Sequence, residues 1–268
     1  MKVHILTDNQ CKLPHLKQEN GVSILVETKK HTILIDAGQS DVFMQNAEAM
    51  GLDLQKVDVC CLSHGHYDHC NGILHFLNVN KHAKVYASSD IFGKYYNINN
   101  EYVGVSPELK KHKDRFVFVD ADYFIDESIY FFTGNDRQTV NSIREIGYTA
   151  KSNGLMEPDD FHHELYVVIG DGKKKIVVSG CTHKGINNVL YWARHENISA
   201  FIGGIRFGNL SFEVPKQAAQ LQQAVADLKR YNVKYFAMHC RADSIYRHLE
   251  QELTDKFYRV TVGESFEI

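Results

Sequence analysis

Short apolar stretches along the first part of the chain predict β-strands. Within them, apolar residues alternate with polar ones or run almost without interruption, and turn residues lie between the stretches. The predicted strands comprise residues 2–6 (KVHIL), 22–28 (VSILVET), 31–38 (HTILIDAG) and 57–62 (VDVCCL). Between the last two, apolar residues at helical spacing predict a helix with Ser40 as its N-cap and Gly51 as its end.

Strands and helices alternate in the later part of the chain. The predicted strands are LYVVI (165–169), KIVVSG (175–180), SAFIGG (199–204) and YFAM (235–238), and helices are predicted after Gly185, from Pro215 and after Asp243. This interleaving is typical of helices that cover the faces of a sheet. We therefore predict an α/β fold built as one domain, residues 1–268, because no repeat or linker divides the chain. Residues 90–160 have a weaker pattern and are interpreted as an insertion or a substrate-facing lobe.

Composition narrows the classes of function. The chain is 44% hydrophobic and 24% charged, enough apolar material for a substantial core. Its net charge of -3 lacks the basic excess typical of nucleic-acid binding, and no apolar run approaches the roughly 18 residues of a membrane-spanning helix. Residues 1–10 lack the features of a signal peptide, and the six cysteines are not spaced as a disulfide framework.

These features predict the setting of the protein. We expect a cytoplasmic protein with reduced thiols and a small-molecule substrate, and neither nucleic acid nor a membrane as partner. Aromatic residues around Tyr95, Tyr96 and Tyr102 offer a contact for a homo-oligomer.

The stretch CLSHGHYDHC, residues 61–70, carries the strongest chemical signal. If the chain continues extended from the preceding strand, His64 and His66 point to the same side, because side chains of a strand alternate. Asp68 and His69 follow where the next helix begins and can face a neighbouring position. Four ligand-type residues within six positions therefore predict two adjacent metal sites, in preference to loop or core histidines that hydrogen-bond to the backbone.

Further ligand-type residues lie at the ends of later strands. They are His162 and His163 before one strand, Cys181 and His183 after another, and His239 and Cys240 after a third. Strand ends of an α/β fold commonly carry functional groups. The repetition predicts that these residues complete the sites that the first cluster begins.

The motif SHGHYDH matches the HxHxDH signature of the metallo-β-lactamase superfamily, and LIDAG (34–38) resembles the strand element that precedes it there. The stretches TDNQ, DDFHHEL, SGCTHKGINN, IGG and MHC resemble the branch that includes 7,8-dihydropterin-6-methyl-(ribofuranosyl)aminobenzene-phosphate synthase-like proteins. The resemblance is dense up to residue 80 and after 159. It implies a four-layer αββα sandwich with a metal site in a cleft at one edge of the two packed sheets.

The resemblance also implies two ligand sets. The first is His64, His66 and a downstream histidine from the 162–163 pair, with His163 favoured over His162. The second is Asp68, His69 and His239. Asp36 is implied as an acceptor that orients a ligating imidazole.

One position departs from the superfamily pattern. Where an aspartate usually bridges the two metals, this chain has Cys181, followed by His183. The bridge is then the Cys181 thiolate, His183 or a water; alternatively, Cys181 is a small buried packing residue. His183 is favoured as a ligand or a polar group near the site. Two zinc ions per chain are expected, since thiolate favours zinc, and manganese or iron fits a set of only histidine and aspartate.

Three further residues are candidates for substrate contact. Arg206 follows IGGI and either presents a cation to an anionic group or is a surface arginine. Tyr67, inside the motif, faces the substrate or packs beneath the loop. Lys184 lies in a turn expected to shape the pocket.

The leading hypothesis is a metal-dependent hydrolase that acts on a small ester, phosphoester or amide through an activated water, with His66 and Asp68 as catalytic residues. The alternatives are carbon transfer on a pterin phosphate, as in the branch's synthase, and a mononuclear iron sulfur dioxygenase. A binder of metal or ligand without turnover is the fourth hypothesis. The intact His66 argues against a diiron oxygen reductase, in which the resemblance implies a glutamate.

Overall fold

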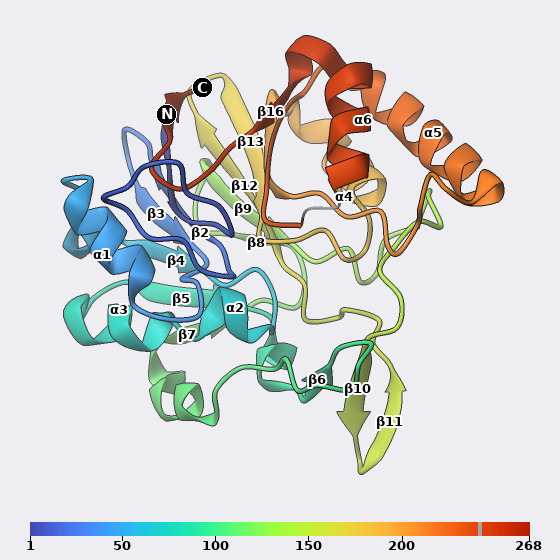
Figure 1. Ribbon diagram of the computed structural model, residues 1–268. Coiled ribbons are helices and arrows are strands. Elements are labelled where there is room, and N and C mark those ends of the chain that lie inside the picture. Colours follow the sequence, from blue (N-terminus) through green and yellow to red (C-terminus); the bar gives the residue numbers. More distant parts are fainter. Residues whose placement is uncertain (241–242) are drawn as a thin grey trace.

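Two β-sheets packed face to face form the centre of the molecule, and helices cover both outer faces (Figure 1). The computed structural model describes residues 1–240 and 243–268. In spatial order, the first sheet consists of β17 (Ser265–Glu267), β1 (Lys2–Thr7), β2 (Ser23–Glu27), β3 (Thr32–Ile35), β4 (Val59–Cys61), β5 (Lys84–Ala87) and β7 (Phe116–Phe118). The second consists of β16 (Phe257–Arg259), β15 (Lys234–Met238), β14 (Ala200–Gly204), β13 (Lys174–Ser179), β12 (Tyr166–Asp171), β9 (Ile129–Phe132) and β8 (Tyr123–Phe124).

The helices divide between the two outer faces. Beside the first sheet lie α1 (Val42–Ala49), α2 (Tyr67–Cys70) and α3 (Ile73–Val79), and beside the second lie α4 (Ile186–Trp192), α5 (Pro215–Lys229) and α6 (Asp243–Leu253). Short 3-10 turns occur at Leu54–Lys56, Ser89–Phe92, Pro107–Arg115, Arg194–Glu196 and Thr254–Lys256. This arrangement confirms the predicted four-layer αββα sandwich.

Alternation along the strands explains why both faces of each sheet are apolar. In β2, Ile24 and Val26 face the core between the sheets, whereas Leu25 packs among residues of α1 and α3. In β14, Ile202 faces the core between the sheets and Phe201 faces the side of α4, α5 and α6. Strands buried on both faces read as nearly continuous apolar runs, which is the pattern seen in the sequence.

Most strands and helices expected from the sequence are present. The helix predicted between Ser40 and Gly51 forms as α1, although Asp41 stands at its N-cap. The helix expected from Asp68 onward is split into α2 and α3, which are separated at Asn71 and Gly72. The predicted helix positions at Gly185, Pro215 and Asp243 match the starts of α4, α5 and α6.

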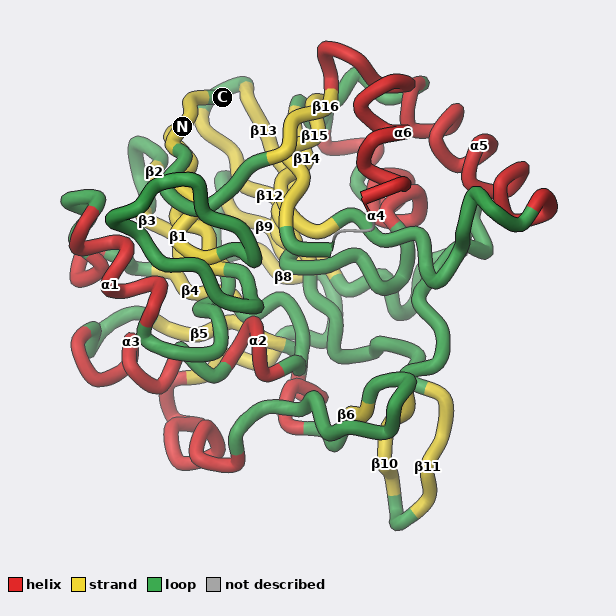
Figure 2. The backbone as a smooth tube through the Cα atoms, viewed as in Figure 1, coloured by secondary structure: helices red, strands yellow, loops and turns green. Residues whose placement is uncertain are grey.

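Residues 90–160 belong partly to the main sheets and partly to a separate element. Strands β7, β8 and β9 lie in the two main sheets. A smaller sheet contains β11 (Leu155–Pro158), β10 (Thr149–Ser152) and β6 (Tyr95–Tyr96), and its β10–β11 hairpin projects from the body of the molecule (Figure 2). This smaller sheet is separate from the two sheets of the sandwich.

Parallel pairing places several strand ends at one edge. Strands β13, β14 and β15 run parallel to one another, as do β3, β4 and β5. The carboxyl ends of β4, β13 and β15 carry the ligand-type residues noted in the sequence. Among the described residues, no helix is long and apolar enough to span a bilayer.

Candidate metal centre

The loop that leaves β4 and the short helix α2 supply the HGHYDH residues. His64, His66 and His69 are buried, and the Asp68 side chain is 14% exposed. The loops after β13 and β15 bring Cys181, His183 and His239 to the same place. Residues separated by more than a hundred positions thus converge at the edge where the two sheets meet.

A buried carboxylate orients two of these histidines. Asp36 Oδ2 accepts hydrogen bonds from His69 Nδ1 and from Ser63 Oγ, both at 2.7 Å. Because the Ser63 hydroxyl donates to Asp36, its oxygen accepts from His64 Nδ1 at 2.9 Å. Neutral His64 therefore carries its lone pair on Nε2, on the side that faces the other histidines. Asp36 occupies the orienting position that the resemblance implies.

Three imidazoles converge on a first point. His64 Nε2 lies 3.0 Å from His66 Nδ1 and 3.3 Å from His183 Nε2. Burial lowers the pKa of all three well below the ordinary value, and neighbouring histidines lower it further. In the described part of the chain, His66 Nε2 is also a buried nitrogen without a hydrogen-bond partner. Several neutral imidazoles whose ring nitrogens face one another at short distance form a donor set that can bind a divalent metal such as zinc.

Asp68, His69 and His239 converge on a second point. His69 Nε2 lies 3.3 Å from His239 Nε2, and Asp68 Oδ2 lies 3.5 Å from the same His239 nitrogen. His239 Nδ1 donates to Asn9 Oδ1 at 2.8 Å, which leaves Nε2 on the side of Asp68 and His69. Asp68 is buried, which alone would raise its pKa, but the neighbouring imidazoles, His69 first, outweigh burial and lower it. The carboxylate is therefore ionised at neutral pH.

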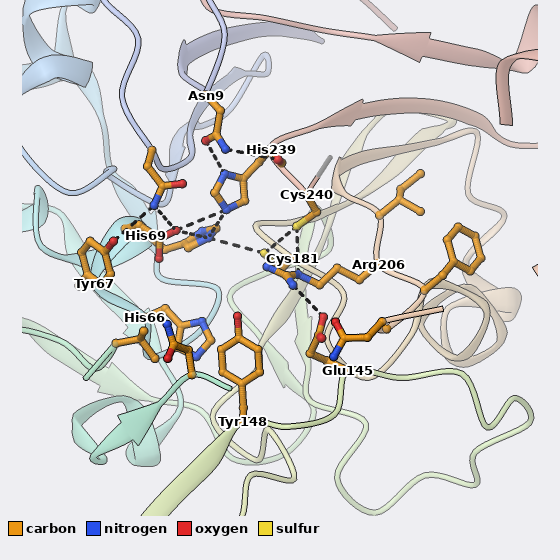
Figure 3. Close-up of a pocket in the computed structure, with 18 of the residues that line it drawn as sticks. Asn9, His66, Tyr67, His69, Glu145, Tyr148, Cys181, Arg206, His239 and Cys240 are labelled. Carbon is orange, nitrogen blue, oxygen red and sulfur yellow. Dashed lines mark hydrogen bonds and ion pairs between the residues drawn. The ribbon is translucent and has the colours of Figure 1, made fainter. Parts of the chain in front are cut away.

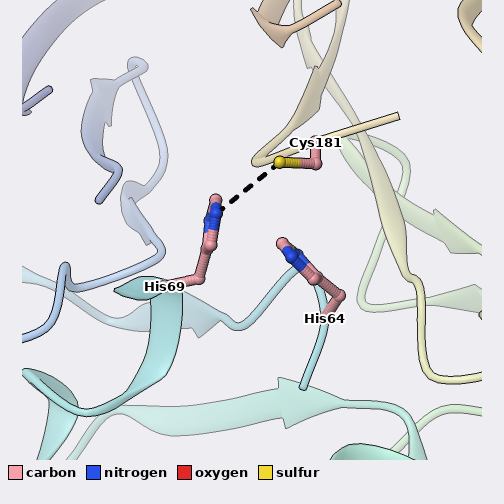
Figure 4. Close-up of side chains that lie close together, drawn as sticks. All are labelled: His64, His69 and Cys181. Atoms are coloured by element: carbon pink, nitrogen blue, oxygen red, sulfur yellow. Dashed lines mark hydrogen bonds between the residues drawn. The ribbon is translucent and has the colours of Figure 1, made fainter. Parts of the chain in front are cut away.

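Cys181 lies between the two groups. Its Sγ is 3.6 Å from His69 Nε2, and His64, His69 and Cys181 together offer donor atoms within 4.8 Å of one another (Figure 4). Of the bridging candidates left open by the sequence, the thiol of Cys181 is the one that faces a member of each group.

His163 lies close by but uses both ring nitrogens within the protein. Its Nδ1 accepts from the Gly65 backbone N–H at 2.9 Å, so its Nε2 carries the proton and donates to Asp159 Oδ2 at 3.2 Å. The neighbouring His162 is half exposed and pairs with Asp160. The third nitrogen beside His64 and His66 is that of His183, and His163, which the resemblance implies, lies with His66 and Asp159 in a neighbouring group of donor atoms within 4.8 Å of one another.

Two backbone positions at the site are strained. Asp36 and His239 have φ values of 55° and 62°, in the left-handed region that side chains other than glycine rarely adopt. Such strain often accompanies functional sites, where the surrounding structure holds the residue in place. Here it turns both side chains towards the metal-binding groups directly after their strands.

An open pocket of about 470 Å³ leads to the second group (Figure 3). Its lining is polar and includes the amides of Asn9, Asn20, Asn97 and Asn209. Tyr67 also lines it, and the Tyr67 hydroxyl accepts from Asn20 Nδ2 at 3.4 Å. The volume is within the range of small-molecule sites.

Arg206 and Lys184, the two positively charged residues predicted to contact the substrate, are both engaged with other protein groups. Arg206 lines the pocket, but its Nη1 pairs with the buried Glu145 at 2.7 Å, so its charge is largely balanced. Lys184 is not among the described residues that line the pocket. Its Nζ instead donates to the Thr133 carbonyl at 3.0 Å and to Asn135, and burial lowers its pKa to about 8. The Lys184 side chain therefore stabilises the loop that contains Thr133 and Asn135 and does not face the pocket.

Sequence reasoning did not select Tyr148 and Glu145 as site residues, and it named Cys240 only as a ligand-type residue at the end of a strand. The Tyr148 ring stacks on His66 with centroids 5.4 Å apart, and burial raises its pKa to about 12. Cys240 Sγ lies 3.0 Å from Cys181 Sγ and 3.2 Å from Arg206 Nε. Burial would raise the pKa of Cys240, but the hydrogen bond from Cys181 and the charge of Arg206 lower it. Its place beside His239 was the one available sequence signal.

Comparison with known proteins agrees with this fold. The sequence model of the metallo-beta-lactamase superfamily matches residues 16–256. The chain therefore belongs to the metallo-beta-lactamase superfamily, which consists largely of metal-dependent hydrolases.

Individual relatives are distant. An uncharacterized protein of Methanocaldococcus jannaschii is 28% identical over 243 residues, covering 89% of this chain and 90% of its own length. The 7,8-dihydropterin-6-methyl-4-(beta-D-ribofuranosyl)-aminobenzene-5'-phosphate synthase of the same organism is 23% identical, covering 92% and 89%. A solved structure described as a metal-dependent hydrolase of the beta-lactamase superfamily, Tm1679, has a TM-score of 0.84 at 23% identity, covering 100% and 99%. This likeness shows that the fold is shared.

Proposed function

We propose that this protein is a metal-dependent hydrolase that holds two zinc ions and acts on a small ester, phosphoester or amide. One observation carries the proposal: two groups of buried donor atoms, with Cys181 between them, lie at the end of an open polar pocket. Ser63 and Asn9 form hydrogen bonds with Nδ1 of His64 and of His239, respectively. The Nε2 atom of each ring therefore faces the other donor atoms of its group.

We assign the ligands from this geometry. His64, His66 and His183 would hold the first ion, and Asp68, His69 and His239 the second. Cys181 would contact both, because its sulfur lies among donors of each group. Histidine, carboxylate and thiolate together are a set that suits zinc better than manganese.

Bound ions of this kind supply Lewis-acid activation of water and substrate. The protein's own groups would then position the reactants and move protons. Asp68, ionised and at the pocket wall, can accept a proton from water and return it to the leaving group. Tyr148 keeps its proton at neutral pH and can donate a hydrogen bond to a developing negative charge.

The polar pocket wall indicates a polar substrate. Four asparagines offer donors and acceptors, whereas the charge of Arg206 is shared with Glu145. We therefore propose recognition mainly through hydrogen bonds.

Substitution of His66 tests the catalytic part of the proposal. We expect His66→Ala to abolish turnover on any phosphoester, ester, lactone or amide that the wild-type protein hydrolyses. The exposed His82, which lies outside the site, provides the control variant His82→Ala, which should keep full activity. Turnover that survives in His66→Ala would refute the proposal.

Similarity to the synthase supports a second candidate function. The synthase aligns over 92% of this chain at 23% identity, which favours carbon transfer onto an aminobenzene acceptor from a dihydropterin donor. Mass spectrometry of a mixture of a dihydropterin, an aminobenzene phosphate and metal-loaded protein distinguishes the two functions. A new adduct favours transfer, and hydrolysis without an adduct favours the hydrolase.

A further inference from the structure

Cys240 places a second thiol at the candidate metal centre, next to that of Cys181. It directly follows His239 and lines the pocket, while Cys181 enters from the loop after β13. Their Sγ atoms lie 3.0 Å apart, and the two side chains point towards each other in Figure 3. Cys181, His239 and Cys240 offer three donor atoms within 4.8 Å of one another.

The surrounding residues fix the position of this thiol. Arg206 Nε donates to Cys240 Sγ at 3.2 Å, and Glu145 holds the Arg206 guanidinium from the other side at 2.7 Å. Gly204 leaves room for the sulfur, because a Cβ at this position would lie 2.5 Å from Cys240 Sγ. The thiol is thus held at the site by contacts on several sides.

The other cysteines show the contrast. Cys60, Cys61 and Cys70 are packed in the hydrophobic cores, as expected for thiols that act as small apolar groups. Cys11 lies outside the site, where its thiol donates to the Leu13 carbonyl.

We propose that Cys240 is a metal ligand, so that the second ion is bound by two sulfurs, from Cys181 and Cys240, together with His69 and His239. This inference rests on the metal-binding part of the proposed function and is independent of hydrolysis. Two sulfurs at about 2.3 Å from one tetrahedral zinc ion lie about 3.8 Å apart, so the present 3.0 Å needs to widen by less than about 1 Å.

The two positions would then differ in the metals that they accept. Three imidazoles surround the first position, which accepts several divalent metals, whereas two thiolates make the second position selective for a soft or borderline ion such as zinc. In this assignment Cys240 takes the place at the second ion that the proposed function gives to Asp68, and the Asp68 carboxylate stays available to accept a proton.

Cobalt substitution tests the inference without any substrate. Wild-type protein, reduced with a phosphine and loaded with cobalt, should show visible ligand-field bands and near-ultraviolet absorption from thiolate-to-cobalt charge transfer. Cys240→Ser should lower the charge-transfer absorption by about a third to a half, because the thiolate of Cys240 is lost whereas that of Cys181, in contact with one or both ions, remains. Cys11→Ser is the matched control and should leave the spectrum unchanged.

Each result has a distinct meaning. Unchanged charge-transfer absorption in a cobalt-binding Cys240→Ser would overturn the role of Cys240 and leave the proposed function standing. A wild-type chain without cobalt bands would overturn the metal sites themselves. If Cys240→Ser does not fold, cadmium NMR of the wild-type chain decides. A resonance shifted downfield as far as two sulfur ligands require supports the inference, and a position typical of one sulfur overturns it.

Discussion

The ring nitrogens of His64 and His163 show how hydrogen bonds select a ligand. Both rings lie beside the HGHYDH loop, but only His64 has its lone pair directed at other imidazoles. His163 accepts from the Gly65 N–H through Nδ1, and its Nε2 faces Asp159. At this scale, the identity of a ligand depends on which nitrogen the protein protonates.

A pair of alanine variants tests this selection. We expect His183→Ala to lose about one metal ion per chain, because it removes a donor of the first group. His163→Ala should keep the full metal content and lose only stability, since its ring serves Gly65 and Asp159. Metal analysis of both purified variants makes the comparison. The reverse pattern would return the ligand role to His163.

The sequence could not decide between these two histidines for a physical reason. β12 and β13 form an antiparallel hairpin, with Val167 opposite Val178, so the residue before β12 and the residue after β13 reach the same edge. The apolar pattern predicts the strand ends, but the direction of each ring depends on partners such as Gly65, which is distant in the sequence from His163.

At the scale of elements, the metal centre depends on the close approach of the end of β13 to the first sheet. Gly180 follows β13, and a Cβ there would lie 2.1 Å from Asp36 Oδ2 and 2.3 Å from Ser63 Oγ. The missing side chain thus lets the strand exit contact the carboxylate that orients His69.

Substitution of Gly180 tests this contact. We expect Gly180→Ala to displace Asp36 from His69 and to weaken metal binding by about tenfold or more, as loss of an orienting partner does. Gly170→Ala in β12 is the control, because its Cβ would meet only ordinary contacts at 3.6 Å or more. Competition with a metal-sensitive dye measures both affinities. Equal affinities in the two variants would contradict the role of the close approach.

Elements with strong periodicity were predictable, whereas the pocket wall was not. α5 and the strands around it follow apolar patterns that tertiary packing reinforces. Tyr148 and Glu145 lie at the end of a long irregular segment whose course depends on contacts such as Asn188 with Asn141. Irregular segments have no periodicity, so their side chains cannot be placed from sequence alone.

At the scale of the molecule, a histidine joins the two sheets at the end opposite the metal centre. His31 precedes β3 and lies between Asp58, which precedes β4, and Asp126, which lies between β8 and β9. Lys30 also pairs with Asp126 and with Glu127. Burial alone would lower the pKa of His31, but the hydrogen bonds to Asp126 and Asp58 outweigh it and raise the pKa.

This cluster predicts a pH dependence of stability. Because the pKa of His31 is higher in the folded chain, its contribution is fully present below the unfolded value of about 6.5 and is lost as pH rises through the folded value. His31→Gln should therefore lower the free energy of unfolding most in mild acid, and the difference from wild type should shrink above that range. Urea unfolding of metal-free protein across pH measures the difference, with His82→Gln as control. A constant difference would contradict the prediction.

The two-ion metal centre is the claim on which the rest depends, and its metal content is the most direct test. Protein purified without chelators and analysed by plasma mass spectrometry should contain about two zinc ions per chain. His66→Ala should contain fewer. A folded wild-type chain that holds no metal, even after incubation with zinc and removal of the excess, would contradict the account.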